Sequence, residues 1–412
     1  MKLFEPGTLG SLELPNRIVK SAMSEAVCTA DGRVTDAMLR MYSRWARGGA
    51  GLLITGLAYV QPDGRENLSD LGVSDDIHIE GLRALAEAVH HHGSRIAVQL
   101  NHSGGQCFAD RIESKPVGPS ARRNWAMNVK CRALDEPEIL RLITDFGDAA
   151  YRAQQAGIDA VQVHAAHGWL VNQFLTPRTN KRRDAWGGST ENRARFMLAI
   201  IAEIHRRCGP DYPVLVKLNI DDGGPLRGGI DLKLGIAYAR LLDQAGVAAL
   251  EVSGGTGESY FGLYTCRGDL PVEPSRRMLD KDGRLFAKAL KPFIRPLRAA
   301  IHPKTRLVEH YWEHAATHVR AACSIPIMLV GGIRRRSEME RVLADGVADY
   351  ISLGRPLVRQ PGLPRLLAAG ATDTDSEAQC VSCNRCLVEV GMGAPLKCHY
   401  KPQHHAASLR AV

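Results

Sequence analysis

The sequence predicts a (β/α)8 TIM barrel, and three observations lead to this expectation. Short apolar segments alternate with helical patterning along most of the 412 residues, which is typical of βαβ units. A junction in which an alanine-rich helix stops at glycine and an apolar strand begins occurs as AGIDAVQVH, AGVAALEVS and DGVADYISLG. Eight such apolar segments in series favour a closed parallel barrel over an open doubly wound sheet.

The elements follow in chain order, beginning with a hairpin-like lead-in over residues 1–16 that carries turn signals at Pro6-Gly7 and Leu9-Gly10. Helical patterning covers 35–47 and 79–91. Glycine ends the three junction helices because it adopts the left-handed geometry that follows a helix. The eight strands are predicted at 18–23, 51–55, 95–100, within 156–164, at 214–218, within 245–253, at 327–330 and within 345–354.

Two regions exceed a minimal barrel and divide the chain. We expect a (β/α)8 barrel domain over 1–370, interrupted after the sixth strand by an insertion at about 260–306, and a short Cys-rich, metal- or cluster-binding extension over 371–412. The insertion from Phe261 to Arg306 holds eleven Lys or Arg against four Asp or Glu. It predicts a solvated lid, a clamp for an anionic substrate such as an acyl-CoA, or a segment that adheres to an acidic surface.

Composition limits the class of protein. A chain with 45% hydrophobic residues can bury a large core, yet no segment approaches the roughly 20 apolar residues of a membrane span. The start, MKLFEPGTLG, lacks the apolar run of a signal peptide, so we expect a cytoplasmic protein. We also expect the chain to form homo-oligomers.

Polar residues at strand ends are the candidates for chemistry. They are Ser24 after the first strand, Gln99 at the third, His164 and His167 at the fourth, and Lys217 at the fifth. A lone histidine is usually structural, but a pair at a strand end, with glutamine and lysine at others, favours a site. Two imidazoles can donate N–H bonds to one anionic oxygen.

Glycines follow the last two predicted strands, as Gly331-Gly332 and as Gly354 before Arg355. Exposed backbone N–H groups and a guanidinium at this position favour phosphate binding, with tight packing as the alternative.

Four cysteines crowd near the C-terminus. Cys380, Cys383 and Cys386 form CxxCxxC, and Cys398 follows. Three close thiolates and a distant fourth suit a [4Fe–4S] cluster, whereas structural zinc more often uses two CxxC pairs. Iron–sulfur, zinc and plain cysteines all remain open.

These motifs resemble the Old Yellow Enzyme family of FMN-dependent ene-reductases, especially the barrel half of the 2,4-dienoyl-CoA reductases. The resemblance covers about residues 1–360 and rests on PNRIVKSAM, VQLNHSGGQ, the stretch from HAAHGWLVNQF to ENRARF, LVGGIR and SLGRP. It implies that Gly332, Gly354 and Arg355 hold the phosphate and that His164 and His167 bind the carbonyl of the substrate. The residues that it implies at the flavin ring are Ala22, Met23, Ser24, Gln99 and Lys217.

The resemblance also implies the reaction, which is hydride transfer from flavin N5 to an activated C=C bond of an enone or an enoyl thioester, in the CH–CH class of oxidoreductases. In the dienoyl-CoA reductases a comparable cysteine set holds a [4Fe–4S] cluster. No strand-linked GxGxxG is present, so we expect electrons from NAD(P)H bound over the FMN or from a separate partner protein.

One departure concerns the proton that the α-carbon needs. The family usually has a tyrosine two residues after the second histidine, and here that position is Trp169, whose indole is no general acid. Tyr260, Tyr264 or water would then supply the proton. The alternative is an oxidative enzyme of the same fold, of the dehydrogenase or demethylase type. A basic residue is also common where this chain has Gly105.

A different class of protein would combine a zinc module with a basic nucleic-acid-binding segment. The aromatic-poor insertion and the polar strand ends argue against it. We therefore expect a small-molecule substrate and no nucleic acid.

Overall fold

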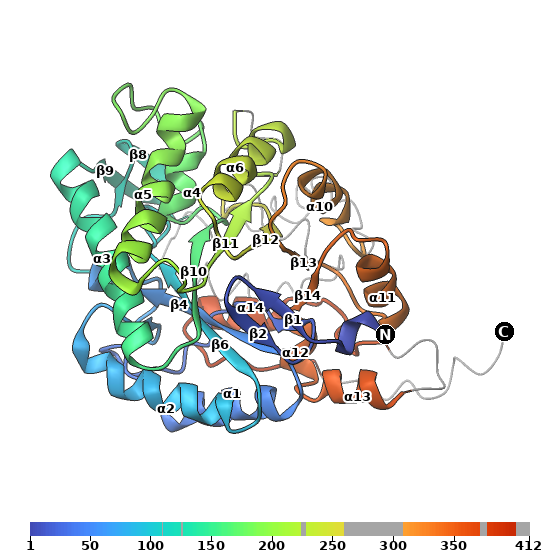
Figure 1. Cartoon of the computed structure of the whole chain (residues 1–412). Coiled ribbons are helices and arrows are strands. Elements are labelled where there is room, and N and C mark those ends of the chain that lie inside the picture. Colours follow the sequence, from blue (N-terminus) through green and yellow to red (C-terminus); the bar gives the residue numbers. More distant parts are fainter. Residues whose placement is uncertain (109, 125–126, 224–227, 259–307, 371–376, 401–412) are drawn as a thin grey trace, which may run out of the picture.

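Eight parallel strands close into a barrel in the computed structural model, which describes residues 1–108, 110–124, 127–223, 228–258, 308–370 and 377–400 (Figure 1). The last strand pairs with the first, and the first pairs with the second, so the barrel is complete. The predicted fold is confirmed. In chain order the barrel strands are β3 (Ile18–Lys20), β4 (Leu52–Tyr59), β6 (Arg95–Asn101), β10 (Ala160–Ala165), β11 (Val214–Asn219), β12 (Ala249–Ser253), β13 (Ile327–Val330) and β14 (Tyr350–Leu353).

Helices surround the barrel, and side-chain caps begin several of them. Asp135 accepts from the backbone N–H of Glu138 at 2.9 Å, and Ser189 accepts from that of Asn192 at 3.1 Å. The outer helices are α1 (Asp36–Arg47), α2 (Ile79–His90), α3 (Glu136–Gln155), α5 (Thr190–Cys208), α6 (Leu232–Gln244), α10 (Glu313–Arg320), α11 (Arg336–Ala344) and α13 (Leu363–Ala369). Among helices of the described ranges, none is both long and apolar enough to cross a membrane.

The predicted lead-in hairpin is confirmed and closes the lower end of the barrel. Its strands β1 (Gly7–Leu9) and β2 (Leu12–Leu14) are antiparallel. Leu9 and Leu14 join a buried cluster with Val19, Leu215 and other inward residues of the barrel strands. Figure 1 shows the hairpin across the barrel axis. The opposite end, where the strands terminate at their carboxyl side, is left for a site.

The three junction glycines have the predicted left-handed geometry, with φ of 78° at Gly157, 71° at Gly246 and 69° at Gly346. The first barrel strand is shorter than predicted, because it ends at Lys20 rather than at Met23. Residues from Ser21 onward leave the sheet and turn over the top of the barrel.

Several short elements went unpredicted. A small sheet of β7 (Val117–Gly118), β9 (Val129–Ala133) and β8 (Arg122–Asn124) follows β6, and β5 (Leu71–Gly72) extends the barrel sheet beside β4. Strands of two to five residues with charged members carry too little alternation to be recognised from sequence. The remaining short helices are η1 (Lys2–Phe4), η2 (Pro62–Gly64), η3 (Asp76–His78), α4 (Leu170–Leu175) and α12 (Arg355–Arg359).

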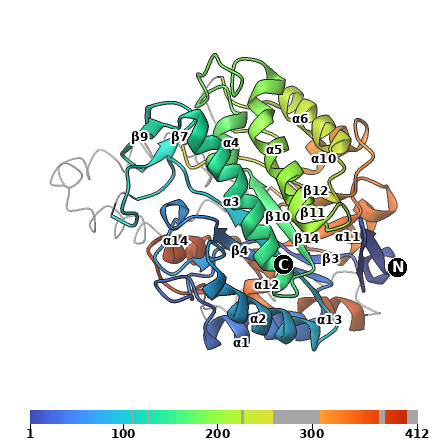
Figure 2. The same ribbon diagram turned by 60° about the vertical axis from the view of Figure 1, so that its left-hand side comes forward.

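The predicted basic insertion, including Tyr260 and Tyr264, lies outside the described residues. The described part of the Cys-rich extension, 377–400, packs on the catalytic end of the barrel and contains α14 (Arg385–Gly391). The backbone N–H of Leu396 donates to the carbonyl of Glu25 at 2.8 Å. Figure 2 shows α14 against the barrel on the side of β4. The extension is therefore part of the wall around the site, although the boundary predicted at residue 370 stays a prediction.

Candidate active site

A cavity of about 350 Å³ opens at the carboxyl ends of the barrel strands, within the size range of small-molecule sites. Every residue predicted to contact the flavin, its phosphate or the substrate lines it. These residues are Ala22, Met23, Ser24, Gln99, His164, His167, Trp169, Lys217, Gly332, Gly354 and Arg355. The structure thus brings the predicted residues into one space, while their individual roles remain predictions.

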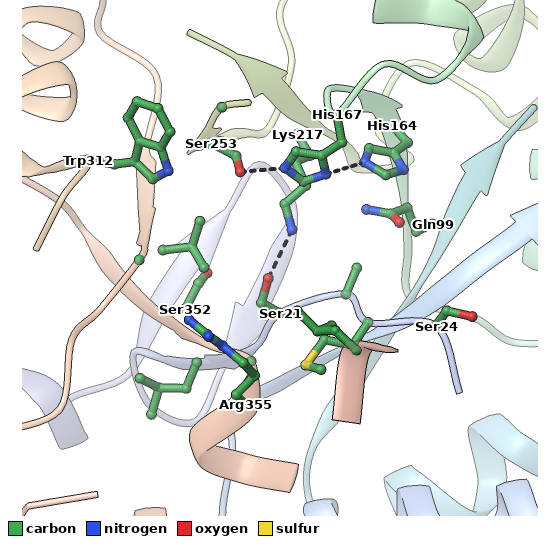
Figure 3. Close-up of a pocket in the computed structure, with 18 of the residues that line it drawn as sticks. Ser21, Ser24, Gln99, His164, His167, Lys217, Ser253, Trp312, Ser352 and Arg355 are labelled. Atoms are coloured by element: carbon green, nitrogen blue, oxygen red, sulfur yellow. Dashed lines mark hydrogen bonds between the residues drawn. The ribbon is translucent and has the colours of Figure 1, made fainter. Parts of the chain in front are cut away.

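The floor of the cavity is a buried network around Lys217. Its ammonium lies 3.0 Å from a carboxylate oxygen of Glu251 and donates to the hydroxyl of Ser21 at 2.9 Å (Figure 3). Gln162 donates to the same carboxylate at 2.9 Å, and Gln99 donates to Gln162 at 2.7 Å. Strand pairing positions these residues, because β6, β10, β11 and β12 are consecutive neighbours in the sheet.

The pKa of Glu251 shows that this network stabilises its carboxylate in spite of burial. Burial alone raises the pKa of a carboxyl, but Lys217 and hydrogen bonds from Ser21, Gln162 and Lys217 hold it below its usual value. Lys217 is therefore a fixed donor whose charge is balanced by Glu251. Sequence reasoning missed Glu251, although a glutamate inside the apolar segment AGVAALEVS was a usable signal.

The two predicted histidines lie in contact. His164 Nε2 and His167 Nδ1 are 3.0 Å apart, and His167 Nε2 lies 2.7 Å from the hydroxyl of Ser253 (Figure 3). His164 Nδ1 is buried without a hydrogen-bond partner in the described residues. The rings thus bond to each other in this arrangement, so donation by both to one substrate oxygen requires that this bond be exchanged.

Burial and the nearby ammonium of Lys217 lower the pKa of both histidines well below the usual value. Both imidazoles are therefore neutral near pH 7. The backbone of His167 has a left-handed φ of 63°, held by a bond from the side chain of Gln106 to its carbonyl at 2.9 Å. The loop after β10 is built to direct this ring into the cavity.

The opposite end of the cavity has the backbone shape of a phosphate site. Gly331 and Gly332 have φ of 121° and 75°, and a Cβ on Gly332 would come within 2.8 Å of the carbonyl of Val308. Ser352 has a buried hydroxyl with no hydrogen-bond partner among the described residues, and it faces the same cavity. Arg355, three residues after Ser352, donates to the side-chain oxygen of Asn384 in the extension.

Trp169 occupies the position where the resemblance leads us to expect a tyrosine. It is buried at the cavity wall, with its ring centroid 6.0 Å from that of His164. It can pack against a ligand but cannot protonate one. Tyr311 and Trp312 also line the cavity, near the glycines that follow β13, and were not predicted.

Glu66 is a further unpredicted residue on the wall, contributed by the loop after β4. Its backbone N–H donates to Asp70 at 2.9 Å, and Ser24 donates to the other oxygen of Asp70 at 3.3 Å. Enclosure by protein, followed by the charge of Asp70, raises the pKa of Glu66 to about 8. Polar side chains in a predicted loop carry no periodic signal, so sequence reasoning could not single it out.

The four clustered cysteines line one small cavity together with Arg355 and Arg359, and Cys380 also borders the main cavity. Ser382 and Asn384 have left-handed φ of 53° and 56°, which folds the CxxCxxC segment into a tight loop. Within the described ranges, no three Cys, His, Asp or Glu side chains are close enough to coordinate one metal ion. The four thiols nevertheless face the same small cavity, and a set of thiol donors suits a soft metal or an iron–sulfur cluster.

A flavin mononucleotide fits the residues of the main cavity. A phosphate suits one end of the cavity, where glycines leave room that a Cβ would occupy and where the Ser352 hydroxyl and Arg355 can act as donors. The heteroatoms of a ring suit the polar floor formed by Gln99 and Lys217.

Comparison with known protein families decides the affiliation. The model of the "NADH:flavin oxidoreductase / NADH oxidase family" matches residues 2–244. The chain belongs to this family. It is a flavin oxidoreductase of the Old Yellow Enzyme type, as the resemblance predicted.

Two curated relatives differ in length. An NADH oxidase of Thermoanaerobacter brockii is 34% identical over 93% of this chain, which spans 52% of that relative. A 4,4'-dithiodibutanoate disulfide reductase of Rhodococcus erythropolis is 31% identical over 95% of this chain and 93% of its own length. The chain thus spans about half the length of the NADH oxidase and nearly all of the disulfide reductase.

Two solved structures agree with the fold. The complex of a 2-naphthoyl-CoA reductase with 2-naphthoyl-CoA superimposes with a TM-score of 0.81 and 25% identity, over 96% of this chain and 56% of that one. An old yellow enzyme homologue from Zymomonas mobilis gives a TM-score of 0.70 and 26% identity, over 91% and 94%.

Proposed function

We propose that this flavin oxidoreductase uses FMN to reduce the activated C=C bond of an enone or an enoyl thioester. The observation that supports the proposal is one cavity with a neutral histidine pair, a balanced lysine at its floor and glycine loops with Arg355 at its other end. This arrangement combines oxyanion donors, a flavin-ring floor and a phosphate cradle. The reaction belongs to the CH–CH class.

FMN, when bound, supplies the hydride that the β-carbon of the substrate receives. Gly332, Gly354 and Arg355 would hold the phosphate, and Lys217 and Gln99 would donate to the polar edge of the ring. Met23 would contact the cofactor near Gly354, since a Cβ on Gly354 would lie 3.1 Å from the Met23 sulfur. Ala22 and Ser24, the neighbours of Met23 in the chain, also line the cavity and would contact the flavin ring.

His164 and His167 would orient the substrate by donating to its carbonyl oxygen. Because both rings are neutral, they polarise the carbonyl without adding charge, and this draws electron density from the β-carbon. Trp169 would cover the substrate and exclude water beside His164.

The acyl-CoA form of the substrate is supported by likeness to the 2-naphthoyl-CoA reductase and by the basic composition of the insertion. For the thiol cluster we propose a [4Fe–4S] centre held by Cys380, Cys383, Cys386 and Cys398, with zinc as the alternative. Cys380 borders both cavities, so such a centre would adjoin the flavin and accept electrons from a partner protein. Iron, sulfide and zinc analysis of the purified protein separates the two.

Trp169 favours a second candidate, an oxidative flavoenzyme of dehydrogenase or demethylase type, because that direction needs no proton donor at the position. Anaerobic mixing distinguishes the candidates. A reductase has its flavin reduced by NADH or NADPH and reoxidised by cyclohex-2-enone or crotonyl-CoA. An oxidative enzyme is instead reduced by a saturated substrate and is not reoxidised by either alkene.

The histidine pair provides the matched test. Changing His164 and His167 to Ala should slow reoxidation by cyclohex-2-enone about 100-fold, since two donors to a developing oxyanion are lost. Reoxidation by ferricyanide should be unchanged. The exposed His91→Ala variant serves as the control. Equal enone rates in all three proteins would exclude the proposed role.

A further inference from the structure

The proposed reduction needs a proton at the α-carbon, and the described cavity offers one carboxyl that meets this need. Trp169 cannot donate a proton. Glu66 lines the cavity from the loop after β4, and β4 lies two strands away in the sheet from β10, which carries His164 and precedes His167. It is thus a carboxyl within the space that encloses the substrate-binding pair.

The Glu66 carboxyl makes no hydrogen bond or ion pair with the described residues. Arg111, the cation that acts on the Glu66 carboxyl, donates its hydrogen bonds elsewhere, to the backbone carbonyl of Glu66 at 3.0 Å and to that of Gly391 at 3.3 Å. A second Arg111 bond goes to the side chain of Asn67. An enclosed carboxyl without a counter-ion favours its neutral, proton-bearing form.

Asp70 makes the two carboxyls of the loop unequal. It accepts hydrogen bonds from the backbone N–H groups of Glu66 at 2.9 Å and Asn67 at 2.7 Å, and from Ser24 at 3.3 Å. Burial raises the pKa of Asp70 to about 6, and these bonds oppose the rise, so Asp70 ionises before Glu66 and its charge then opposes ionisation of Glu66. Asp70 and Arg111 are the charged groups that act on Glu66. Two neighbouring carboxyls with separated roles are a recurrent acid–base arrangement.

We propose that the Glu66 carboxyl delivers the proton to the α-carbon of the substrate, in place of a tyrosine at Trp169; this inference rests on the proposed reduction of C=C bonds. A bound reduced FMN would supply the hydride to the β-carbon and would be left oxidised. The C=C π pair, carried through the carbonyl oxygen held by the histidines, takes the Glu66 proton at the α-carbon. The Glu66 carboxylate then regains a proton from solvent, and NAD(P)H restores the reduced cofactor.

The test uses the holoenzyme and the variants Glu66→Gln, Glu66→Asp and, as a matched control on an exposed loop, Glu113→Gln. Reoxidation by cyclohex-2-enone should slow at least 100-fold in Glu66→Gln, which is the usual contribution of a positioned acid. Glu66→Asp should recover part of the rate. Reduction by NADH or NADPH and reoxidation by ferricyanide, which takes no proton, should stay within twofold and show that the variants fold.

A second readout does not depend on turnover. The infrared spectrum near pH 7 should contain the band of a protonated carboxyl that is missing in Glu66→Gln and disappears as the pH rises through about 8. In wild type, enone reoxidation should fall over the same range, and Glu66→Gln should lack this fall.

An enone rate in Glu66→Gln within threefold of wild type, or an ionised Glu66 at pH 7, would overturn the assignment of Glu66 alone. A wild-type enzyme that exchanges electrons with NAD(P)H and ferricyanide but reduces no alkene would overturn the proposed function as well. The two failures are therefore distinguishable.

Discussion

Two glutamates of the site, Glu251 beneath the cavity and Glu66 in its wall, are in opposite electrostatic states. Glu251, on the floor, faces the Lys217 ammonium at 3.0 Å and has its pKa held below the usual value. Glu66, on the wall, makes no ion pair with the described residues, and its pKa is raised by removal from water and by the charge of Asp70, against a smaller opposing effect of Arg111. Removal from water raises the pKa of both carboxyls, and the charged neighbours then decide which of the two keeps its proton.

This difference separates two functions within one site. The paired glutamate fixes a lysine where a cofactor ring needs a donor, and the unpaired glutamate retains a proton that can be transferred. The following predictions test this contrast.

The largest effect is expected when the pair on the floor is broken. Lys217→Met leaves the Glu251 carboxylate buried without its cation, which should lower the free energy of unfolding by about 3–5 kcal/mol. Urea unfolding at pH 7 measures this. The double variant Lys217→Met, Glu251→Gln should recover much of the loss, and an unstable double variant together with a stable single variant would refute the pairing argument.

The barrel and many of the residues that line its cavity could be predicted from the sequence, because both depend on local sequence patterns. Junction glycines, apolar strands and polar residues directly after strand ends determined where His164, Lys217 and Arg355 would meet. The hydrogen-bond and ion-pair partners of these residues were harder to predict from the sequence. Glu251 lies in a strand and Ser21 was assigned to one, while Glu66 and Asp70 depend on how a loop folds beside β4, which pairing of distant segments decides.

A smaller and pH-dependent effect should separate the two glutamates. Since the folded pKa of Glu66 is raised, the folded state binds a proton that the unfolded state has lost between about pH 4.3 and the folded value of about 8, so wild-type stability falls as the pH rises through this window. Glu66→Gln removes that fall and should be more stable than wild type at pH 8, by on the order of 1–2 kcal/mol.

Glu251→Gln should show the reverse sign. Its folded pKa is lowered, so the carboxylate contributes stability that is present above its unfolded pKa and is lost as the pH falls through the folded value. The variant should be less stable than wild type at pH 7 and approach it in acid. Parallel stability curves for the two variants would contradict the comparison.

The smallest effect is expected at the tryptophan. If Glu66 supplies the proton, Trp169→Tyr should change enone reoxidation less than threefold, because a second donor adds little to one already in position. Stopped-flow absorbance of the flavin measures the rate. A gain of more than tenfold would mean that wild type lacks an effective acid.

The proposed reaction depends on a flavin in the cavity, and the visible absorption spectrum of the purified protein tests its presence most directly. We predict a flavin spectrum, release of FMN on denaturation at about one per chain, and loss of that FMN in a Gly354→Val variant, whose side chain would meet Met23. A protein that binds no flavin, either as purified or after incubation with FMN, would contradict the account.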